Sequence, residues 1–136
     1  MKQFVSLKKN HKSLVKVKGT EKNRIFFSKK NNYVLKCSSY TVLTDKQLKS
    51  AYNSMKKRLK KSGTLILHVF PTIGLTKKPI EVRMGKGKGS KISVYVYPIR
   101  PGKILFELEG VTFKLAKDIF RLGMHKLNIK SKLIIV

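Results

Sequence analysis

A stretch of eight residues, Arg83 to Ser90, carries the residue types best suited to binding chemistry. Its sequence, Arg-Met-Gly-Lys-Gly-Lys-Gly-Ser, alternates three glycines with two lysines, and no acidic residue lies between Glu81 and Glu107. Glycine has no Cβ, so this backbone can adopt positive φ angles and approach another molecule closely. The lysines add positive charge to the same backbone. The pattern favours a loop that contacts phosphate groups, and a flexible hairpin loop kept soluble by its lysines is the equally weighted alternative.

Two glycine-rich nucleotide-binding motifs do not match this stretch. The P-loop pattern needs a second glycine followed by lysine and a hydroxyl residue, but Ser90 stands where that glycine would be. The dinucleotide fingerprint needs its third glycine at the same position and a helix after it, whereas residues 92–97 have the pattern of a strand. We therefore expect no nucleotide cofactor, and no other cofactor is predicted.

The charge of the chain is extreme for its length. Its 136 residues include 32 Lys and Arg but only 6 Asp and Glu, which gives a formal net charge of +26. A free globular protein with this charge would repel itself, so we expect a polyanionic partner: nucleic acid, an anionic membrane or an acidic protein. The basic residues occur from end to end, which favours a protein surrounded by polyanion. The hydrophobic fraction of 41% is sufficient for one folded domain.

The sequence supplies few residues for catalysis, metal binding or membrane insertion. Cys37 is the lone cysteine, which excludes an internal disulfide or a multi-cysteine zinc site, and we expect it to be buried in a strand. A nuclease could use His11, His68 or His125, but the six acidic residues form no paired motif, so we predict that the protein is not an enzyme. No apolar run has the length of a signal peptide or a membrane span.

The first predicted helix begins after Thr44, which forms a capping box with Gln47, and its predicted C-terminal cap is Gly63. Its apolar stripe has helical spacing and comprises Leu48, Ala51, Tyr52, Met55 and Leu59. The opposite face has seven basic residues without an acidic partner: Lys46, Lys49, Lys56, Lys57, Arg58, Lys60 and Lys61. That face favours contact with phosphate. A basic amphipathic helix also permits membrane-surface binding, although the stripe is narrow and lacks Trp and Phe, which favours packing into a core.

The second predicted helix follows Thr112, with a stripe formed by Ala116, Ile119, Phe120, Gly123 and Leu127 and broadened by Leu115. Strands are predicted over 24–28, 33–37, 40–43, 64–70, 92–99, 103–109 and 133–136. A type II turn at residues 100–103, with proline and glycine in its centre, is predicted to join two of them, 92–99 and 103–109, as a hairpin. These elements predict an α+β fold with two helices packed on a mainly antiparallel sheet. We expect a basic N-terminal arm over 1–23 and a single domain over 24–136, with a protruding loop over 76–91.

Several motifs together resemble the core of the universal large-subunit ribosomal protein sixteen family, in its bacterial and organellar form. The main matches are Thr76-Lys77-Lys78-Pro79, the segment 82–89 (Val-Arg-Met-Gly-Lys-Gly-Lys-Gly), and the segment 101–107 (Pro-Gly-Lys-Ile-Leu-Phe-Glu). Supporting matches are His11-Lys12, the segment 68–71 and the segment 126–130. The chain departs from the family pattern at Asn128, where a proline is usual, and at residues 90–93, where an acidic-aromatic segment is usual.

The resemblance implies an α+β domain embedded in large-subunit ribosomal RNA (rRNA), below the central protuberance and beside the path of the aminoacyl-site tRNA. It implies that the glycine-lysine loop reaches toward tRNA and the peptidyl-transferase region. The implied partners are large-subunit rRNA, tRNA at the aminoacyl site and neighbouring large-subunit ribosomal proteins, with no homo-oligomer and no membrane insertion. The RNA-binding residues carried over from the match are Lys9, His11, Lys12, Lys77, Lys78, Arg83, Met84, Gly85, Lys86, Gly87, Lys88 and Gly89.

The predicted function is therefore that of a structural constituent of the large ribosomal subunit, which binds rRNA and helps to position tRNA. The alternative is a basic protein that binds polyanions or a membrane surface outside the ribosome. Only five of the basic residues are arginine, and the lysine-rich sequence without an evident import signal looks like a copy encoded in a mitochondrion, working in the matrix ribosome. A plastid and the bacterial cytoplasm are the alternative locations.

Overall fold

The computed structural model of the chain describes residues 9–10, 20, 32–83, 85 and 87–135. The predicted strand over 24–28 and most of the predicted arm over 1–23 lie outside these residues. Four of the predicted RNA-binding residues also lie outside them: His11, Lys12, Met84 and Lys86.

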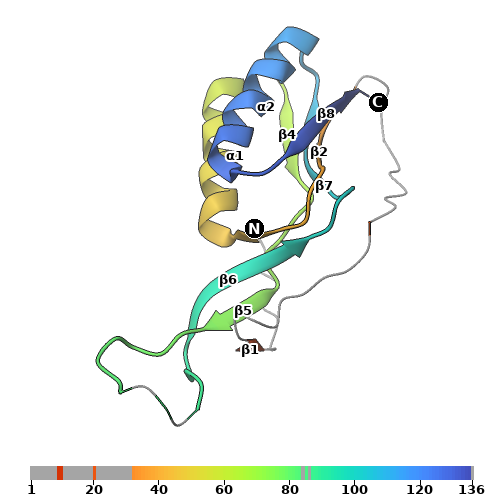
Figure 1. The fold of residues 1–136 in the computed structure, drawn as a ribbon. Helices are drawn as coiled ribbons and strands as arrows, with labels where there is room; N and C mark the ends of the chain where they lie inside the picture. Colours follow the sequence, from red (N-terminus) through yellow and green to blue (C-terminus); the bar gives the residue numbers. More distant parts are fainter. Residues whose placement is uncertain (1–8, 11–19, 21–31, 84, 86, 136) are drawn as a thin grey trace.

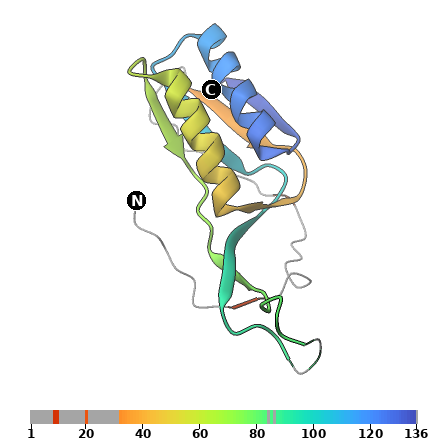
Figure 2. The same ribbon diagram turned by 90° about the vertical axis from the view of Figure 1, so that its left-hand side faces the viewer.

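The described residues form two helices and two four-stranded sheets. The sheet that we call the body sheet has the strand order β4-β7-β2-β8, and its three pairings are all antiparallel. Its strands are β4 (Thr64–Leu67), β7 (Ile104–Glu109), β2 (Tyr33–Cys37) and β8 (Ser131–Ile135). The helices α1 (Asp45–Leu59) and α2 (Phe113–Leu127) lie side by side over one face of this sheet (Figure 1, Figure 2).

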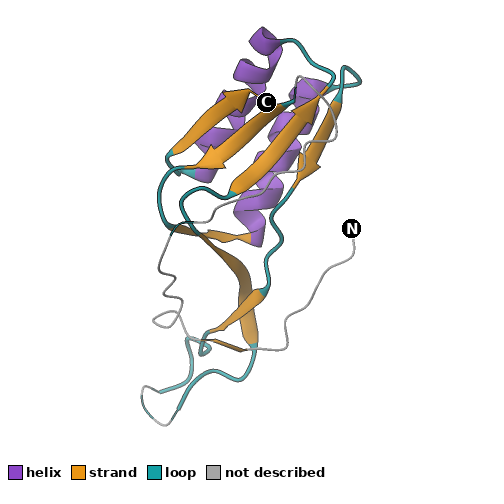
Figure 3. Ribbon diagram, turned by 90° about the vertical axis from the view of Figure 1, so that its right-hand side faces the viewer, coloured by secondary structure: helices purple, strands orange, loops and turns teal. Residues whose placement is uncertain are grey.

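The second sheet, which we call the extension sheet, has the order β1-β5-β6-β3. Its strands are β1 (Lys9–Asn10), β5 (Ile73–Thr76), β6 (Ile92–Ile99) and β3 (Thr41–Thr44). The pairing of β1 with β5 is parallel, and the other two pairings are antiparallel. The extension sheet leads away from the body, and the helices do not cover its outer part (Figure 3). The predicted α+β class is confirmed, with two sheets in place of the single sheet expected.

The hydrophobic core lies between the two helices and the body sheet. The predicted stripe of α1 is buried at Leu48, Ala51, Met55 and Leu59. The stripe of α2 is buried throughout except at Leu115, which is partly buried. The core's largest fully buried side chains include Phe106 of β7 and Phe120 of α2. Because burial of this apolar surface is the main favourable contribution to folding, the core fixes both helices on one side of the sheet.

The predicted capping box at the start of α1 is confirmed. The backbone N–H of Gln47 donates to Thr44 Oγ1 at 3.3 Å, and the backbone N–H of Thr44 donates to Gln47 Oε1 at 2.9 Å. At the end of α2, Asn128 adopts the left-handed conformation at φ 52° and ψ 45°. Asparagine tolerates this conformation better than most residues, which gives a physical reason for Asn128 where the family pattern has proline.

The prediction that residues 92–99 and 103–109 form a hairpin is wrong. The turn itself is present, since the N–H of Lys103 donates to Arg100 O at 3.2 Å and Gly102 has a φ of 95°. However, β6 pairs with β3 and β5, whereas β7 pairs with β2 and β4. Cys37 of β2 binds the turn on both sides, accepting from Gly102 N at 2.8 Å and donating to Lys103 O at 2.9 Å. The turn therefore passes the chain from one sheet to the other.

The prediction that Gly63 caps α1 is also wrong, because the helix ends earlier, with Lys60 at the C-cap. Gly63 has a different role where the chain enters β4. A Cβ built on Gly63 would overlap the carbonyl oxygen of Glu109, at the end of the neighbouring strand β7. The absence of a side chain therefore lets the two backbones approach. Two strands also differ from the predictions. Strand β4 ends at Leu67, before the end of the predicted strand over 64–70, and β5 was not predicted.

We predict that Gly63→Ala lowers the free energy of unfolding by about 1–3 kcal/mol, because the new methyl group forces a backbone shift in a packed region. Denaturant unfolding of the purified protein, followed by circular dichroism, measures this change. The control is Ser62→Ala at the neighbouring exposed position, for which a change within about 0.5 kcal/mol is expected. Equal stabilities for the two variants would contradict the close approach at Gly63.

Candidate nucleic-acid interface

The segment between β5 and β6, residues 77–91, forms a loop at the end of the molecule farthest from the helices (Figure 1). The two ends of this β5–β6 loop touch. A Cβ built on Gly89 would lie 2.5 Å from Lys77 O and 3.0 Å from Lys78 N, which no real side chain tolerates. Gly89 therefore lets one end of the loop pass directly over the backbone of the other.

Two further glycines of the loop are required for conformation and not for packing. Gly85 and Gly87 have φ angles of 107° and 88°, and a Cβ built at either position would meet no atom within 4 Å. Only glycine adopts such angles without strain. Open space around both residues leaves their backbone accessible, as expected for a loop that approaches another molecule closely.

Positive charge surrounds this backbone. The side chains of Lys77, Arg83, Lys88 and Lys91 are exposed. Lys78 is half-buried, and its Nζ donates a hydrogen bond to the carbonyl oxygen of Gly85, which ties the base of the loop to its tip. The described part of the loop thus presents separate cations around an open glycine backbone. Arg83 can bind a phosphate through two parallel hydrogen bonds, whereas each lysine acts as a point charge.

Lys9 lies beside the strand that leads into this loop. Strand β1 pairs with β5, with Lys9 opposite Gly74 and Asn10 opposite Leu75. The structure thus brings the backbone of the predicted arm, at Lys9, next to the strand that precedes Lys77 and Lys78. One extension of the molecule therefore carries the backbone of Lys9 and the β5–β6 loop. The predicted RNA-binding residues described in that loop are Lys77, Lys78, Arg83, Gly85, Gly87, Lys88 and Gly89.

Two apolar residues of the loop were not among the predicted site residues. Ile80 is 95% exposed and Val82 is 52% exposed. Both belong to the segment 79–82, which was predicted only as part of the protruding loop, so the pattern gave no role to its apolar residues. Next to Arg83, they offer an apolar surface for a base or a ribose beside a cation for phosphate.

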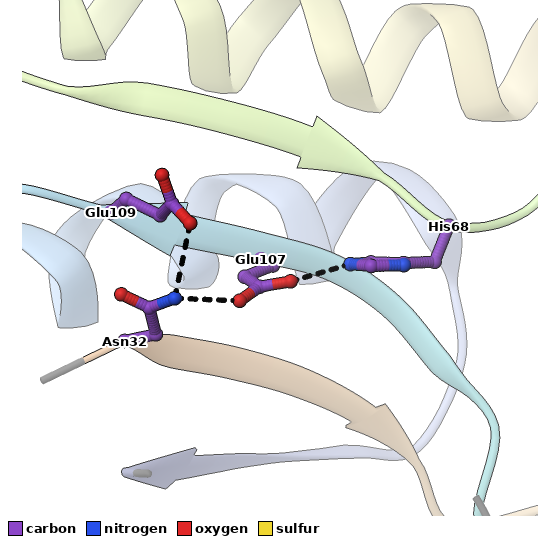
Figure 4. Close-up of polar contacts among 4 residues, drawn as sticks. All are labelled: Asn32, His68, Glu107 and Glu109. Atoms are coloured by element: carbon purple, nitrogen blue, oxygen red, sulfur yellow. Dashed lines mark hydrogen bonds and ion pairs between the residues drawn. The ribbon is translucent and has the colours of Figure 1, made fainter. Parts of the chain in front are cut away.

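Glu107 is a buried carboxylate, 6% exposed, on the central strand β7 of the body sheet. Its Oε2 lies 2.7 Å from His68 Nε2, and its Oε1 accepts a hydrogen bond from Asn32 Nδ2 at 2.7 Å (Figure 4). The same Asn32 nitrogen lies 3.2 Å from Glu109 Oε1. A buried charge is costly without such partners. The network therefore fastens the segments that precede β2 and follow β4 to β7.

This network is structural in character. His68, one of the histidines considered for a nuclease, lies just beyond the end of β4, and its ring nitrogen Nε2 contacts Glu107 (Figure 4). Among the described residues, no group of three or more His, Cys, Asp and Glu side chains could hold a metal ion. Cys37 is buried as predicted, its Sγ donates to Ser39 O at 2.9 Å, and burial raises the pKa of its thiol. Such a thiol is a poor nucleophile.

The basic face of α1 is a second exposed cationic surface. All seven of its predicted basic residues are exposed. The prediction that none has an acidic partner is wrong for Lys49, whose Nζ lies 2.6 Å from Asp45 Oδ2 in an i,i+4 pair. The apolar stripe of α1 is buried in the core, which leaves no apolar face to insert into a membrane surface. In the described ranges, neither helix is long and apolar enough to cross a membrane.

These features define a class of protein: an α+β domain whose second sheet carries a cationic, glycine-containing loop away from the core. The chain belongs to the ribosomal protein L16p/L10e family, whose model matches residues 3–134. This membership agrees with the family resemblance seen in the sequence.

Individual relatives support the same family. The "Large ribosomal subunit protein uL16" of Aeromonas hydrophila is 37% identical over 128 residues, which cover 94% of this chain and 90% of the relative. The protein of the same name from Karelsulcia muelleri is 39% identical over 127 residues, covering 93% and 90%. That from Thioalkalivibrio sulfidiphilus is 40% identical over 102 residues, covering 75% and 74%.

We predict that Glu107→Ala lowers the free energy of unfolding by about 1–3 kcal/mol, because His68 and Asn32 lose a buried acceptor. Denaturant unfolding at neutral pH measures the effect. Glu81→Ala is the matched control, since it removes the same charge from an exposed position and is expected to change stability little. An equal effect of both variants would show that net charge, and not the network, is responsible.

Proposed function

We propose that this protein is a structural constituent of the large ribosomal subunit, in which it binds rRNA and helps to position tRNA near the aminoacyl site and the peptidyl-transferase region. The observation that carries the proposal is the β5–β6 loop: an open glycine backbone with exposed cations, at the tip of an extension that contributes little to the core. Family membership supports a structural ribosomal role, and the ribosomal family is not a family of enzymes.

The loop has the features that RNA contact requires. Arg83, Lys77 and Lys88 offer charge for phosphates, and the backbone at Gly85 and Gly87 is open to close approach. Phosphate contacts of this kind supply affinity and orientation, but they do not distinguish one base sequence from another. The exposed Ile80 and Val82 add apolar contact with a base or ribose. Lys9, His11, Lys12, Lys78, Met84, Lys86 and Gly89 complete the proposed RNA-binding set through the family match.

The body of the protein supplies a broader polyanion contact. The exposed basic face of α1 and the net charge of +26 suit a protein enclosed by rRNA. Neighbouring large-subunit proteins complete the proposed environment. We further propose the ribosome of a mitochondrion as its location, on the basis of the lysine-rich composition. Its compared relatives are bacterial proteins, so an organellar ribosome of bacterial descent accommodates both observations.

Sedimentation of a native extract tests the ribosomal role directly. We expect the protein to sediment with the large subunit through a sucrose gradient at both moderate and high salt. The reason is that many simultaneous phosphate contacts and close packing within the subunit hold it there. Release at modest salt, or absence from the subunit peak, would mean that the protein binds polyanions through its charge alone, without a specific binding site on the subunit. Fractionation of organelles before the gradient tests the mitochondrial location separately.

The loop is tested by neutralising two of its exposed cations, Arg83→Gln together with Lys88→Gln. We expect the variant to enter the large subunit but to bind tRNA at the aminoacyl site at least about tenfold more weakly, since each charged contact contributes roughly 1.5–3 kcal/mol. Filter binding of aminoacyl-tRNA to purified ribosomes measures this.

The matched control removes the same charge from the exposed side of α2, by Lys114→Gln together with Lys126→Gln. Unchanged tRNA binding is expected for the control. If the loop variant binds tRNA as tightly as the wild type, the loop does not contact tRNA. If both variants lose binding equally, only the total charge matters.

A further inference from the structure

A second basic surface lies at the other end of the molecule, between α2 and β8. A groove of about 800 Å³ runs between the side of α2 and the segment that leads into β8, away from the β5–β6 loop. The apolar residues that line this α2–β8 groove include Phe113, Met124 and Leu133. Its volume falls within the range of about 300–1,000 Å³ that is typical of small-ligand sites.

The lining of the groove also includes four basic residues and no acidic residue: Lys117, Arg121, His125 and Lys130. Three of them, Lys117, Arg121 and His125, follow one another at intervals of four along α2 and thus form one row on the helix surface. All four are exposed. None forms a salt bridge with a carboxylate in the part of the chain that the structure covers. A row of basic residues without carboxylate partners, beside an apolar surface, suits a ligand with phosphates and a planar apolar part.

Phe113 supplies a ring for such a planar part. It is 46% exposed at the first position of α2, and its ring lies 6.0 Å from the ring of Tyr33 with an interplanar angle of 43°. Tyr33 is largely buried in β2, so it holds the Phe113 ring in place while part of that ring faces the groove. Fixed aromatic rings of this kind bind unstacked bases in RNA-binding proteins.

We propose that the α2–β8 groove binds an unpaired nucleotide of RNA, with its base on Phe113 and its flanking phosphates along Lys117 and Arg121. This inference rests on the proposed ribosomal function, which supplies RNA as the surrounding polyanion. An acidic peptide could pair with the same cations. RNA is favoured because Phe113 lies four residues before Lys117 on α2, so the base-stacking ring and the basic residues continue one row on the helix, and because the loop on the opposite end is suited to the same ligand.

Ultraviolet cross-linking of purified large subunits that contain the full chain is the first test. After nuclease and protease digestion, mass spectrometry is expected to find a nucleotide attached to the peptide that contains Phe113. A groove peptide that is joined instead to a neighbouring protein, and never to a nucleotide, would overturn the inference. That result would leave the ribosomal function intact if the protein still travels with the subunit.

Matched variants provide a second test on the purified protein, with a ten-nucleotide uridine oligomer as the probe. Lys117→Gln together with Arg121→Gln should make the log–log salt dependence of binding shallower by about 1.4, the value for two phosphate contacts on a single strand. Phe113→Leu should weaken binding roughly fivefold or more, as expected for one lost stacking contact, but should leave binding to a duplex of equal length unchanged.

The control for the charge variant is Lys114→Gln together with Lys126→Gln, which removes two charges from the same helix outside the groove. If this control reduces the salt dependence equally, diffuse charge explains the binding and the groove has no special role. If Phe113→Leu weakens single-strand and duplex binding alike, no base stacks in the groove. This assay does not depend on the ribosome, so its outcome is separable from that of the sedimentation experiment.

Discussion

Repulsion among 32 basic side chains, offset by only 6 acidic ones, is the constraint on which the rest of this structure depends. In the described part of the chain, the buried apolar residues are concentrated in one layer between α1, α2 and the body sheet. Phe106 and Phe120 are fully buried there. The cations are left on the outside of that layer. Because a core of this kind stabilises the fold without requiring ion pairs, the basic residues remain available to a partner that is itself highly charged.

Three of the six acidic residues, Asp45, Glu107 and Glu109, make structural contacts. Asp45 lies in the first turn of α1, where a negative charge also complements the helix dipole. Glu107 and Glu109 lie on β7 and bind Asn32, and Glu107 also binds His68. These carboxylates therefore fasten strand ends and a helix start. None of these three lies in the β5–β6 loop or the α2–β8 groove, so neither cationic surface loses its charge to them.

Local signals in the sequence predicted the helices well, because capping and apolar periodicity are properties of neighbouring residues. Thr44 with Gln47, and the stripe from Ala116 to Leu127, needed no knowledge of the fold. Pairing between strands was less predictable. The turn at Arg100–Lys103 has the residues of a hairpin turn, yet Cys37, more than sixty positions earlier, decides which strand β7 joins. Likewise Gly63 resembles a helix cap in sequence, and only its distance to Glu109 reveals why glycine is needed there.

Some features of the candidate site were likewise predictable from the sequence, and others depended on the fold. The glycine-lysine pattern of residues 83–90 indicated a loop for phosphate contact, but its closure by Gly89 on the backbone of Lys77 and its exposed Ile80 depend on tertiary structure. The α2–β8 groove had no sequence signal, since its residues come from α2 and from the segment after it and only the fold brings Phe113 near Leu133. Helix α1 packs against α2 and also against β3 and β6 of the extension sheet, so the core connects the groove to the base of the loop extension. A protein that binds RNA at both ends can therefore contact two RNA segments at once, which neither surface could do alone.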